Sequence, residues 1–358
     1  MRVSHENLER TCTAIFGAMG SPHWEAGLVS RSLVDANLKG HDSHGVGMIP
    51  TYARHFADGM LKPATAVSKI RDAGVVLQFD GNLGFGRRVG GEAMDEAVGR
   101  CRQSGAAVMT LKSAHHLGRI GAYGEIAMSA GMISIHFVNV VDHAPLVAPW
   151  GGSTGRFVTN PVCIAVPGTD TTPSLLLDMA TSRIALGKAR VAMTRGEDVG
   201  IGNIVDAKGR QCTDPNTLFS DPLGALLPFG EHKGSGLALM CELLAGGLSG
   251  GGTIQPGNPR NGSILNNMFT VVVDPRQFAD PSWLSGELDS LIEYVKSSPA
   301  AQQFGPVRVA GDPERQAAED RHANGIEIDE AEWREILEAG QGLGLSEAEM
   351  YVSDVTKT

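Results

Sequence analysis

The sequence predicts an α/β protein in which a central sheet domain is flanked by helical segments from both ends of the chain. Apolar residues recur at helical spacing over the first 60 residues and again after Pro281. Between these regions, short runs typical of strands alternate with helical patterns. The 358 residues are enough for two hydrophobic cores, although one large α/β domain would also fit.

The first 60 residues are predicted to form two helices followed by a loop. Leu8, Cys12 and Ile15 share one helical face, and Ser21-Pro22 is typical of the start of a second helix. The apolar pattern of that second helix ends at Gly40, a residue type favoured just after a helix.

Strands and helices alternate from residue 74 onward. We predict strands at 75–79, 106–111, 132–140, 162–166, 174–178 and 268–274. We predict helices at 91–103 and 120–129. The strand-helix-strand order, taken from the residues alone, favours a parallel sheet covered by helices.

The chain is predicted to return to helix after Pro281. Near its end, Asp329 with Glu332 and Ser346 with Glu349 have the spacing of capping boxes. We therefore predict a helical domain formed by residues 1–73 together with 277–358, and a sheet domain formed by residues 74–276.

Composition excludes several classes of protein. The 46 glycines follow no collagen period, and 42% hydrophobic with 20% charged residues is not the composition of a disordered chain. A formal net charge of −10 argues against nucleic-acid binding. The five scattered cysteines form no CxxC pair, and no apolar run is long enough for a membrane helix, so we expect a cytoplasmic protein that is not bound to a membrane.

The first candidate site is the polar stretch GHDSHGVGMIPTY at residues 40–52. It forms a loop that leads into a helix N-terminus, where free N–H groups favour a carboxylate ligand. His44 in this loop could give or accept a proton near neutral pH. In the alternative interpretation, Ser43 caps the helix and the histidines are solvated.

The second candidate site is KSAHHLGRIGAYGEIA at residues 112–127. It follows a predicted strand, at the position where open α/β sheets bind ligands. Arg119 adds a fixed positive charge suited to a carboxylate or phosphate. The glycines of this stretch could equally reflect close packing of a helix on the sheet.

No segment has the complete glycine fingerprint of a Rossmann dinucleotide site. Gly81, Gly84 and Gly86 have the wrong spacing, and in EHKGSGLAL Leu239 stands where Gly or Ala is required. His232 and Lys233 precede a predicted helix and would suit a pyrophosphate, or Lys233 could simply be solvated. A bound dinucleotide would therefore require another scaffold.

Metal and serine-hydrolase sites are weaker hypotheses. Adjacent histidines such as His115 and His116 cannot easily face one ion, and no G-x-S-x-G motif is present. We predict no metal.

Together these stretches resemble the type-2 malate/L-lactate dehydrogenase family, whose members use a nicotinamide cofactor without a Rossmann fold. The matching motifs are GHDSHGVGMIPTYARHFADG, SAHHLGRIGAYGE, VAPWGG with the later TNP, LLLDMATS, EHKGSGLALMCELLAGGLSGG and AGDPER. They extend over essentially the whole chain. Within the family, the sequence is most similar to members that reduce 2-oxo acids such as aryl-pyruvates.

The resemblance implies a homodimer with its active site near the subunit interface, and a mixed, largely antiparallel cofactor-binding sheet in place of a parallel one. It implies NAD or NADP as cofactor and a small 2-oxo or 2-hydroxy acid as substrate. The implied catalytic residues are His44 and His116, and the implied substrate-binding residues are Ser43, Met48, Tyr52 and Arg119. The implied cofactor-binding residues are His44, Gly118, Arg119, Ile120, Leu176, Leu177, Asp178, Met179, Ala180, His232, Lys233, Asn266, Gly311, Asp312, Pro313 and Glu314.

The implied reaction is hydride transfer between nicotinamide C4 and substrate C2, with His44 as the acid-base. Many family members carry Arg where this chain has Met48. The replacement of that Arg by Met removes the usual carboxylate contact and leaves an apolar wall suited to a larger substrate side chain. Alternatives are ureidoglycolate, sulfolactate or cyclic imino acid chemistry within the family, a catalytically silent cofactor-binding protein, and a metal-dependent hydrolase.

Overall fold

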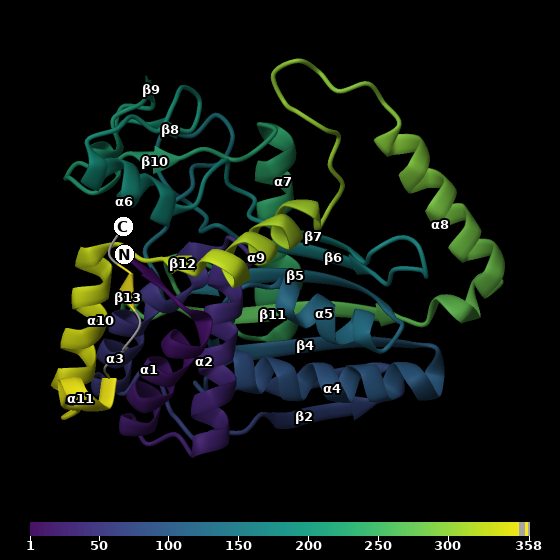
Figure 1. Cartoon of the computed structure of the whole chain (residues 1–358), viewed down its shortest axis with the longest axis horizontal. Helices are drawn as coiled ribbons and strands as arrows, with labels where there is room; N and C mark the ends of the chain where they lie inside the picture. Colours follow the sequence, from purple (N-terminus) through teal and green to yellow (C-terminus); the bar gives the residue numbers. More distant parts are fainter. Residues whose placement is uncertain (351–354, 357–358) are drawn as a thin grey trace.

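The computed structural model describes residues 1–350 and 355–356. A seven-stranded sheet lies beside a cluster of helices formed by segments from the first 60 and from the last described residues of the chain (Figure 1). The helical cluster consists of α1 (His5–Ala18), α2 (His23–Leu38), α3 (Ile49–Ala57), α10 (Glu330–Gly342) and α11 (Glu347–Met350). A small sheet joins the termini, because β1 (Arg2–Val3) pairs with both β12 (Ile326–Glu327) and β13 (Val355–Thr356).

The local signals in the helical cluster act largely as predicted. Asp329 accepts a hydrogen bond from the Ala331 N–H at 2.8 Å, and Ser346 donates through its hydroxyl to Glu349 at 2.7 Å. Gly40 has the positive φ of 80° that favours glycine after a helix. Pro22 is the N-cap of α2, so that helix starts one residue later than predicted.

The large sheet has the order β2-β3-β4-β11-β5-β6-β7. Its strands are β2 (Ser68–Ala73), β3 (Val76–Asp80), β4 (Ala106–His115), β5 (Ile133–Val141), β6 (Val162–Val166), β7 (Leu175–Met179) and β11 (Leu265–Val273). Among the described residues, β3 and β4 form its one parallel pair, and every other neighbouring pair is antiparallel. The expectation of a mixed, largely antiparallel sheet is confirmed.

The parallel sheet favoured by the strand-helix-strand order was wrong, because β2–β3, β5–β6 and β6–β7 are antiparallel neighbours and because a distant strand, β11, separates β4 from β5. β4 and β5 are joined through α5 (Gly121–Ser129) and run in the same direction, since both are antiparallel to β11. β11 lies between them and pairs with both. The local pattern therefore has the expected direction, but a strand from late in the chain separates the two strands.

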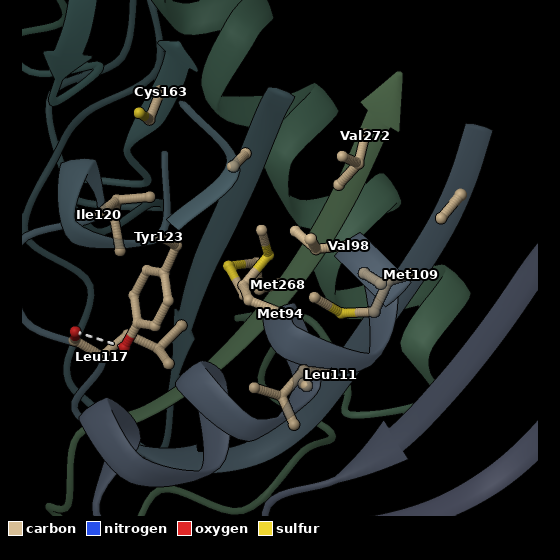
Figure 2. Close-up of a cluster of buried hydrophobic side chains, with 14 of the residues drawn as sticks. Met94, Val98, Met109, Leu111, Leu117, Ile120, Tyr123, Cys163, Met268 and Val272 are labelled. Atoms are coloured by element: carbon tan, nitrogen blue, oxygen red, sulfur yellow. Dashed lines mark hydrogen bonds between the residues drawn. The ribbon is translucent and has the colours of Figure 1, made fainter. Parts of the chain in front are cut away.

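Helices cover both faces of the large sheet. α4 (Gly86–Ser104) and α5 cover the face that carries the main core, where Met94, Met109 and Met268 pack together (Figure 2). The other face is covered by α7 (His232–Cys241) and a π-helix at Glu242–Gly247. Figure 2 also shows Tyr123 of α5, whose hydroxyl donates to the Leu117 carbonyl at 2.8 Å.

Two elements bear on the predicted domain division, which stays a prediction. β2 ends at Ala73 yet belongs to the large sheet, and all six of its residues are exposed, so it has no apolar alternation to reveal it. α8 (Pro281–Lys296) stands apart from the helical cluster on an extended arm (Figure 1). Its Asp289 accepts a hydrogen bond at 2.6 Å from Thr172, in the loop between β6 and β7.

A small lobe between β7 and α7 was not predicted. It contains α6 (Leu186–Arg195), β8 (Ile204–Val205), β9 (Gln211–Cys212), η3 (Pro215–Leu218) and β10 (Ala225–Leu226). Strands of two residues are too short to show an apolar alternation. In the described part of the chain, no helix is both long and apolar enough to cross a bilayer.

Candidate active site

The loop that carries His44 is held in one conformation by α2. It forms two short 3₁₀ turns, η1 (Asp42–His44) and η2 (Val46–Met48), before α3 begins. The amide of Asn37 accepts from the Val46 N–H at 2.8 Å and donates to Asp42 at 2.7 Å. Asn37 is 2% exposed, so this buried clamp fixes the backbone on both sides of His44.

Three side chains from three segments form a hydrogen-bonded chain. His44 Nδ1 lies 3.2 Å from His116 Nε2, and His116 Nδ1 lies 2.8 Å from the Tyr52 hydroxyl. His116 follows the end of β4, and Tyr52 lies on α3. The two predicted catalytic histidines are therefore brought together, and Tyr52, predicted to bind substrate, contacts His116 instead of facing open space.

Burial keeps both histidines neutral near pH 7. Burial, with smaller contributions from the charges of His41 and Arg119, lowers the pKa of His44 to about 4. Burial also lowers the pKa of His116 well below its usual value, and the neighbouring His44 acts in the same direction. Burial raises the pKa of Tyr52, so the phenol stays protonated.

A neutral chain of this kind has two proton arrangements. In the first, Tyr52 donates to His116, His116 donates to His44, and the outer nitrogen of His44, Nε2, carries a proton. In the second, each histidine carries its proton on Nδ1: His44 donates to His116, His116 donates to the Tyr52 oxygen, and His44 Nε2 is an acceptor. The same three side chains can therefore make His44 either an acid or a base.

A second histidine pair, next to Tyr52, was not predicted from the sequence. His55 Nδ1 lies 2.9 Å from His115 Nε2, and burial lowers the pKa of His115 to about 3. His115 also contacts the ring of Tyr52 edge-on, with ring centroids 5.0 Å apart. The spacing of Tyr52 and His55 on one helical face was the available signal.

Arg119 does not face the His44 loop as a free cation. Its side chain is 2% exposed, and Nη2 lies 2.9 Å from Asp35 and 2.7 Å from Glu125. Two carboxylates already neutralise the guanidinium, so the geometry does not favour the predicted role of Arg119 in holding a substrate carboxylate.

The other two predicted substrate-binding residues occupy different surroundings. Ser43 is exposed, and Gly187 of α6 lies so close that a Cβ there would be 3.1 Å from the Ser43 Cβ. α6 thus borders the His44 loop, a contact that the sequence did not reveal. Met48 is partly buried against the core of the helical cluster.

Three of the predicted cofactor-binding segments converge beside the loop. The Gly121 N–H, next to Ile120, donates to Asp178 of β7 at 2.6 Å. Arg315 at the start of α9 (Asp312–Asn324) donates to the Ser174 carbonyl at 2.8 Å. Its neighbour Glu314 lies 3.4 Å from His41.

The remaining predicted cofactor residues lie at the edges of this region. The amide oxygen of Asn266 accepts from the Leu117 N–H at 2.7 Å and so holds the loop that precedes Gly118. His232 opens α7, three residues after Phe229, whose N–H donates to the carbonyl of Thr181, two residues beyond the end of β7.

The convergence of these segments has unmet hydrogen-bonding capacity that fits a dinucleotide. Nε and Nη1 of Arg119 and Oε2 of Glu314 are buried and find no partner within residues 1–350 and 355–356. Buried polar atoms normally have partners, and a ligand that carries both acceptor oxygens and hydroxyl donors would supply them. Nowhere in the same residues do three or more His, Cys, Asp or Glu side chains gather as they would around a metal ion.

Comparisons with known proteins agree over almost the full length of the chain. A family model described as malate/L-lactate dehydrogenase matches residues 3–337. The chain is 39% identical to an L-lactate dehydrogenase of Cupriavidus necator, with 97% of this chain and 99% of that protein covered. It is 40% identical to hydroxycarboxylate dehydrogenase B of Escherichia coli strain K12, with 97% and 95% covered. A solved sulfolactate dehydrogenase from Methanocaldococcus jannaschii superposes with a TM-score of 0.83 at 31% identity, with 96% of this chain and 98% of that chain covered.

Proposed function

The chain belongs to the malate/L-lactate dehydrogenase family and is an oxidoreductase, and from this we propose that it transfers a hydride between a nicotinamide cofactor and C2 of a 2-oxo or 2-hydroxy carboxylic acid. The observation that carries the proposal is the hydrogen-bonded chain from Tyr52 through His116 to His44. These three hydrogen-bonded side chains lie beside the segments that carry Arg119 and Glu314, whose buried polar atoms lack partners among the described residues.

In the proposed mechanism, His44 is the acid-base and the two residues behind it set its protonation. For reduction of a carbonyl, His44 Nε2 gives a proton to the substrate oxygen and takes another from water, while His116 holds the ring of His44 through Nδ1. For oxidation of an alcohol, neutral His44 takes the proton from the substrate oxygen and releases it to water. Gly118–Ile120, Leu176–Ala180 and Gly311–Glu314 would hold the cofactor. When bound, the cofactor supplies or accepts the hydride.

The substrate is proposed to be a 2-oxo acid with a sizeable apolar side chain. Met48, the last residue of the His44 loop, is apolar and only partly buried, and Arg119 is already neutralised by carboxylates. The E. coli relative is named as a hydroxycarboxylate dehydrogenase, which agrees with a range of 2-oxo acids. Ureidoglycolate, sulfolactate or a cyclic imino acid is the alternative, and a metal-dependent hydrolase is the least favoured one.

A substrate panel tests this function. Oxidation of NADH and of NADPH would be followed at equal enzyme concentration with pyruvate, oxaloacetate, phenylpyruvate and 2-oxoglutarate, and then with sulfopyruvate and a cyclic imine. We expect turnover of at least one 2-oxo acid, with phenylpyruvate ahead of pyruvate because of the apolar Met48. Turnover of the cyclic imine alone would move the assignment to the alternative. No oxidation with any substrate, together with one tightly bound zinc ion per chain, would favour a hydrolase.

We also infer that two copies of the chain associate through α8. Trp283, Leu291 and Tyr294 are 61%, 53% and 77% exposed, and no residue of this fully described helix is buried. Within the chain, polar contacts such as that of Asp289 with Thr172 hold α8, and a partner surface would supply the apolar packing from which most helices gain their stability. Light scattering is expected to give twice the mass of one chain, and Leu291→Asp is expected to shift the protein toward one chain. A wild-type mass of one chain would contradict the inference.

A further inference from the structure

The segment of β4 just before His116 contains a β-bulge. Two residues of β4, Lys112 and Ser113, face the single residue Asn267 of β11. Ser113 has a positive φ of 53°, which is uncommon for a residue with a side chain. A bulge interrupts the regular alternation of a strand and changes the direction of the side chains that follow it. The direction of His116 therefore depends on how the bulge is held.

The bulge changes which side chains of β4 enter the main core. Leu111 is buried in that core, and regular alternation would place His115 on the same face, four residues later. Ala114 is buried there instead, and His115 lies against the ring of Tyr52 on α3. The next residue, His116, contacts the Tyr52 hydroxyl. The extra residue therefore turns both histidines toward α3.

Asn267 supplies an acceptor that the bulge would otherwise lack. Its side-chain Oδ1 accepts from the Ser113 N–H at 3.0 Å, and the residue is completely buried. A backbone N–H that loses its partner inside a sheet is costly, so this contact stabilises the bulged conformation. A Cβ on Gly251 would collide with the Asn267 amide. The glycine-rich stretch after α7 therefore leaves the room that Asn267 occupies.

A buried carboxylate on the other face of the sheet determines which way the Asn267 amide faces. Glu242 is 3% exposed, and every group that it contacts is an N–H donor, so it acts as an acceptor. Its Oε2 accepts from Nδ2 of Asn139 at 3.0 Å. The oxygen of Asn139 then accepts from Nδ2 of Asn267 at 3.0 Å. With Nδ2 committed to Asn139, Oδ1 of Asn267 faces the Ser113 N–H.

The far end of the same segment is held by the neighbouring residue of β11. Oδ1 of Asn266 accepts from the Leu117 N–H at 2.7 Å. Adjacent residues of a strand point to opposite faces, so Asn266 and Asn267 hold residues 113–117 from both faces of the sheet. His116 lies between the two contacts, and its backbone is fixed on both sides.

We propose that Asn267 is a positioning residue, which holds the bulge at Ser113 and thereby orients His116 toward His44. The inference rests on the proposed dehydrogenase function, in which His116 holds the ring of His44. It adds a residue outside the hydrogen-bonded chain of Tyr52, His116 and His44.

The first test compares kcat in single and double variants, with the best 2-oxo acid of the substrate panel. Asn267→Ala is expected to lower kcat about tenfold or more, while the dissociation constant of NADH changes less than about twofold. In a His116→Ala background, the same substitution is expected to change kcat less than about twofold, because the side chain that it orients is gone. A residue that only stabilises the fold would lower kcat by the same factor in both backgrounds, and that result would overturn the proposal.

Asn267→Asp is the conservative variant. Its carboxyl keeps an acceptor for the Ser113 N–H, and its second oxygen donates to Asn139 when protonated. We expect it to recover most of the kcat that Asn267→Ala loses, and an Asp variant as slow as the Ala variant would contradict the role of the Ser113 contact.

Thr270→Val is the matched control on the same strand. It removes a buried hydrogen bond, that of the Thr270 hydroxyl with His136 at 2.9 Å. We expect it to lower the midpoint of urea unfolding and to leave kcat unchanged.

A measurement without turnover separates this proposal from the dehydrogenase function. In protein labelled with ¹⁵N-histidine, the ring-nitrogen NMR signals of His116 report its contacts with His44 and Tyr52. We expect these signals to shift in Asn267→Ala and to stay in place in Thr270→Val. Unchanged signals in a folded Asn267→Ala would overturn the proposal. If wild type turns over no 2-oxo acid and the signals shift as expected, the dehydrogenase function fails and the positioning of His116 stands.

Asn139→Ala carries the same test if Asn267→Ala does not fold. It removes the acceptor of Asn267 Nδ2 and frees the Asn267 amide to rotate away from Ser113. The His116 signals are expected to shift and kcat to fall, by a smaller factor than a direct loss of the Ser113 contact would cause. Wild-type signals and wild-type kcat in this variant would overturn the proposal.

Discussion

A His44→Asn variant is expected to oxidise 2-hydroxy acids with kcat about 10²–10⁴-fold lower than wild type, the usual contribution of a positioned acid-base. Asn keeps the polarity of the position but cannot exchange a proton with the substrate. Binding of the reduced cofactor, measured by fluorescence, is expected to change much less than kcat. A variant that keeps more than a few per cent of wild-type activity would exclude His44 as the acid-base.

The pH dependence gives a second measure of the same group. Oxidation requires neutral His44, and burial lowers its pKa to about 4. The oxidative kcat/KM of wild type is therefore expected to stay level from neutral pH down to about 5 and to fall as pH drops further.

Tyr52→Phe removes the hydroxyl that contacts His116 Nδ1, so we expect kcat to fall while the dissociation constant of the reduced cofactor, measured by fluorescence, stays unchanged.

An Arg88→Leu variant is expected to lose about 3–5 kcal/mol of unfolding free energy, because it leaves a buried carboxylate without its partner. Arg88 of α4 lies 2.8 Å from Glu25 of α2, and the Glu25 side chain is fully buried. The same carboxylate accepts from the Ala64 N–H at 2.7 Å. This ion pair therefore joins the helical cluster to the helix layer of the large sheet.

Urea unfolding of wild type and variant at the same pH measures this loss. Arg210→Leu is the control, because Arg210 is 71% exposed in its pair with Asp206, whose side chain is itself 20% exposed, and surface pairs contribute about 0–1 kcal/mol. The double variant Glu25→Gln, Arg88→Leu is expected to regain part of the lost stability, since the unpaired charge is gone. A loss below about 1 kcal/mol in Arg88→Leu would show that the pair is not worth the usual buried-pair energy.

Strand positions were predictable because they depend on local patterns. The predicted strand at 162–166 coincides with β6, and the predicted strand at 75–79 is displaced by one residue from β3. Strand order was not predictable from these patterns, since it depends on contacts between distant segments. β11 pairs with β4 through residues such as Met268 and Leu111, and neither neighbourhood indicates its partner.

The residues of the candidate site were predictable from local patterns, but their tertiary contacts were not. His44 and His116 stood out as polar residues in loops beside predicted helix starts, and the structure brings Nδ1 of His44 to 3.2 Å from Nε2 of His116. The ion pairs that occupy Arg119 involve α2 and α5, and no sequence pattern links Asp35 to Arg119. Charge type could be read from the residues, but whether a charge was already neutralised depended on tertiary contacts.

The late position of β11 in the sequence also determines when the large sheet can be completed during synthesis. β4 and β5 are complete when residue 141 has been synthesised, yet the strand that fills the space between them begins at Leu265. At ordinary translation rates of about 5–20 residues per second, that interval lasts on the order of 10 s. Throughout it, the nascent chain carries two strand edges with unpaired backbone groups, which are templates for aggregation. A ribosome-bound fragment that ends before β11 therefore lacks the centre of its sheet, and productive folding must wait until that strand has emerged.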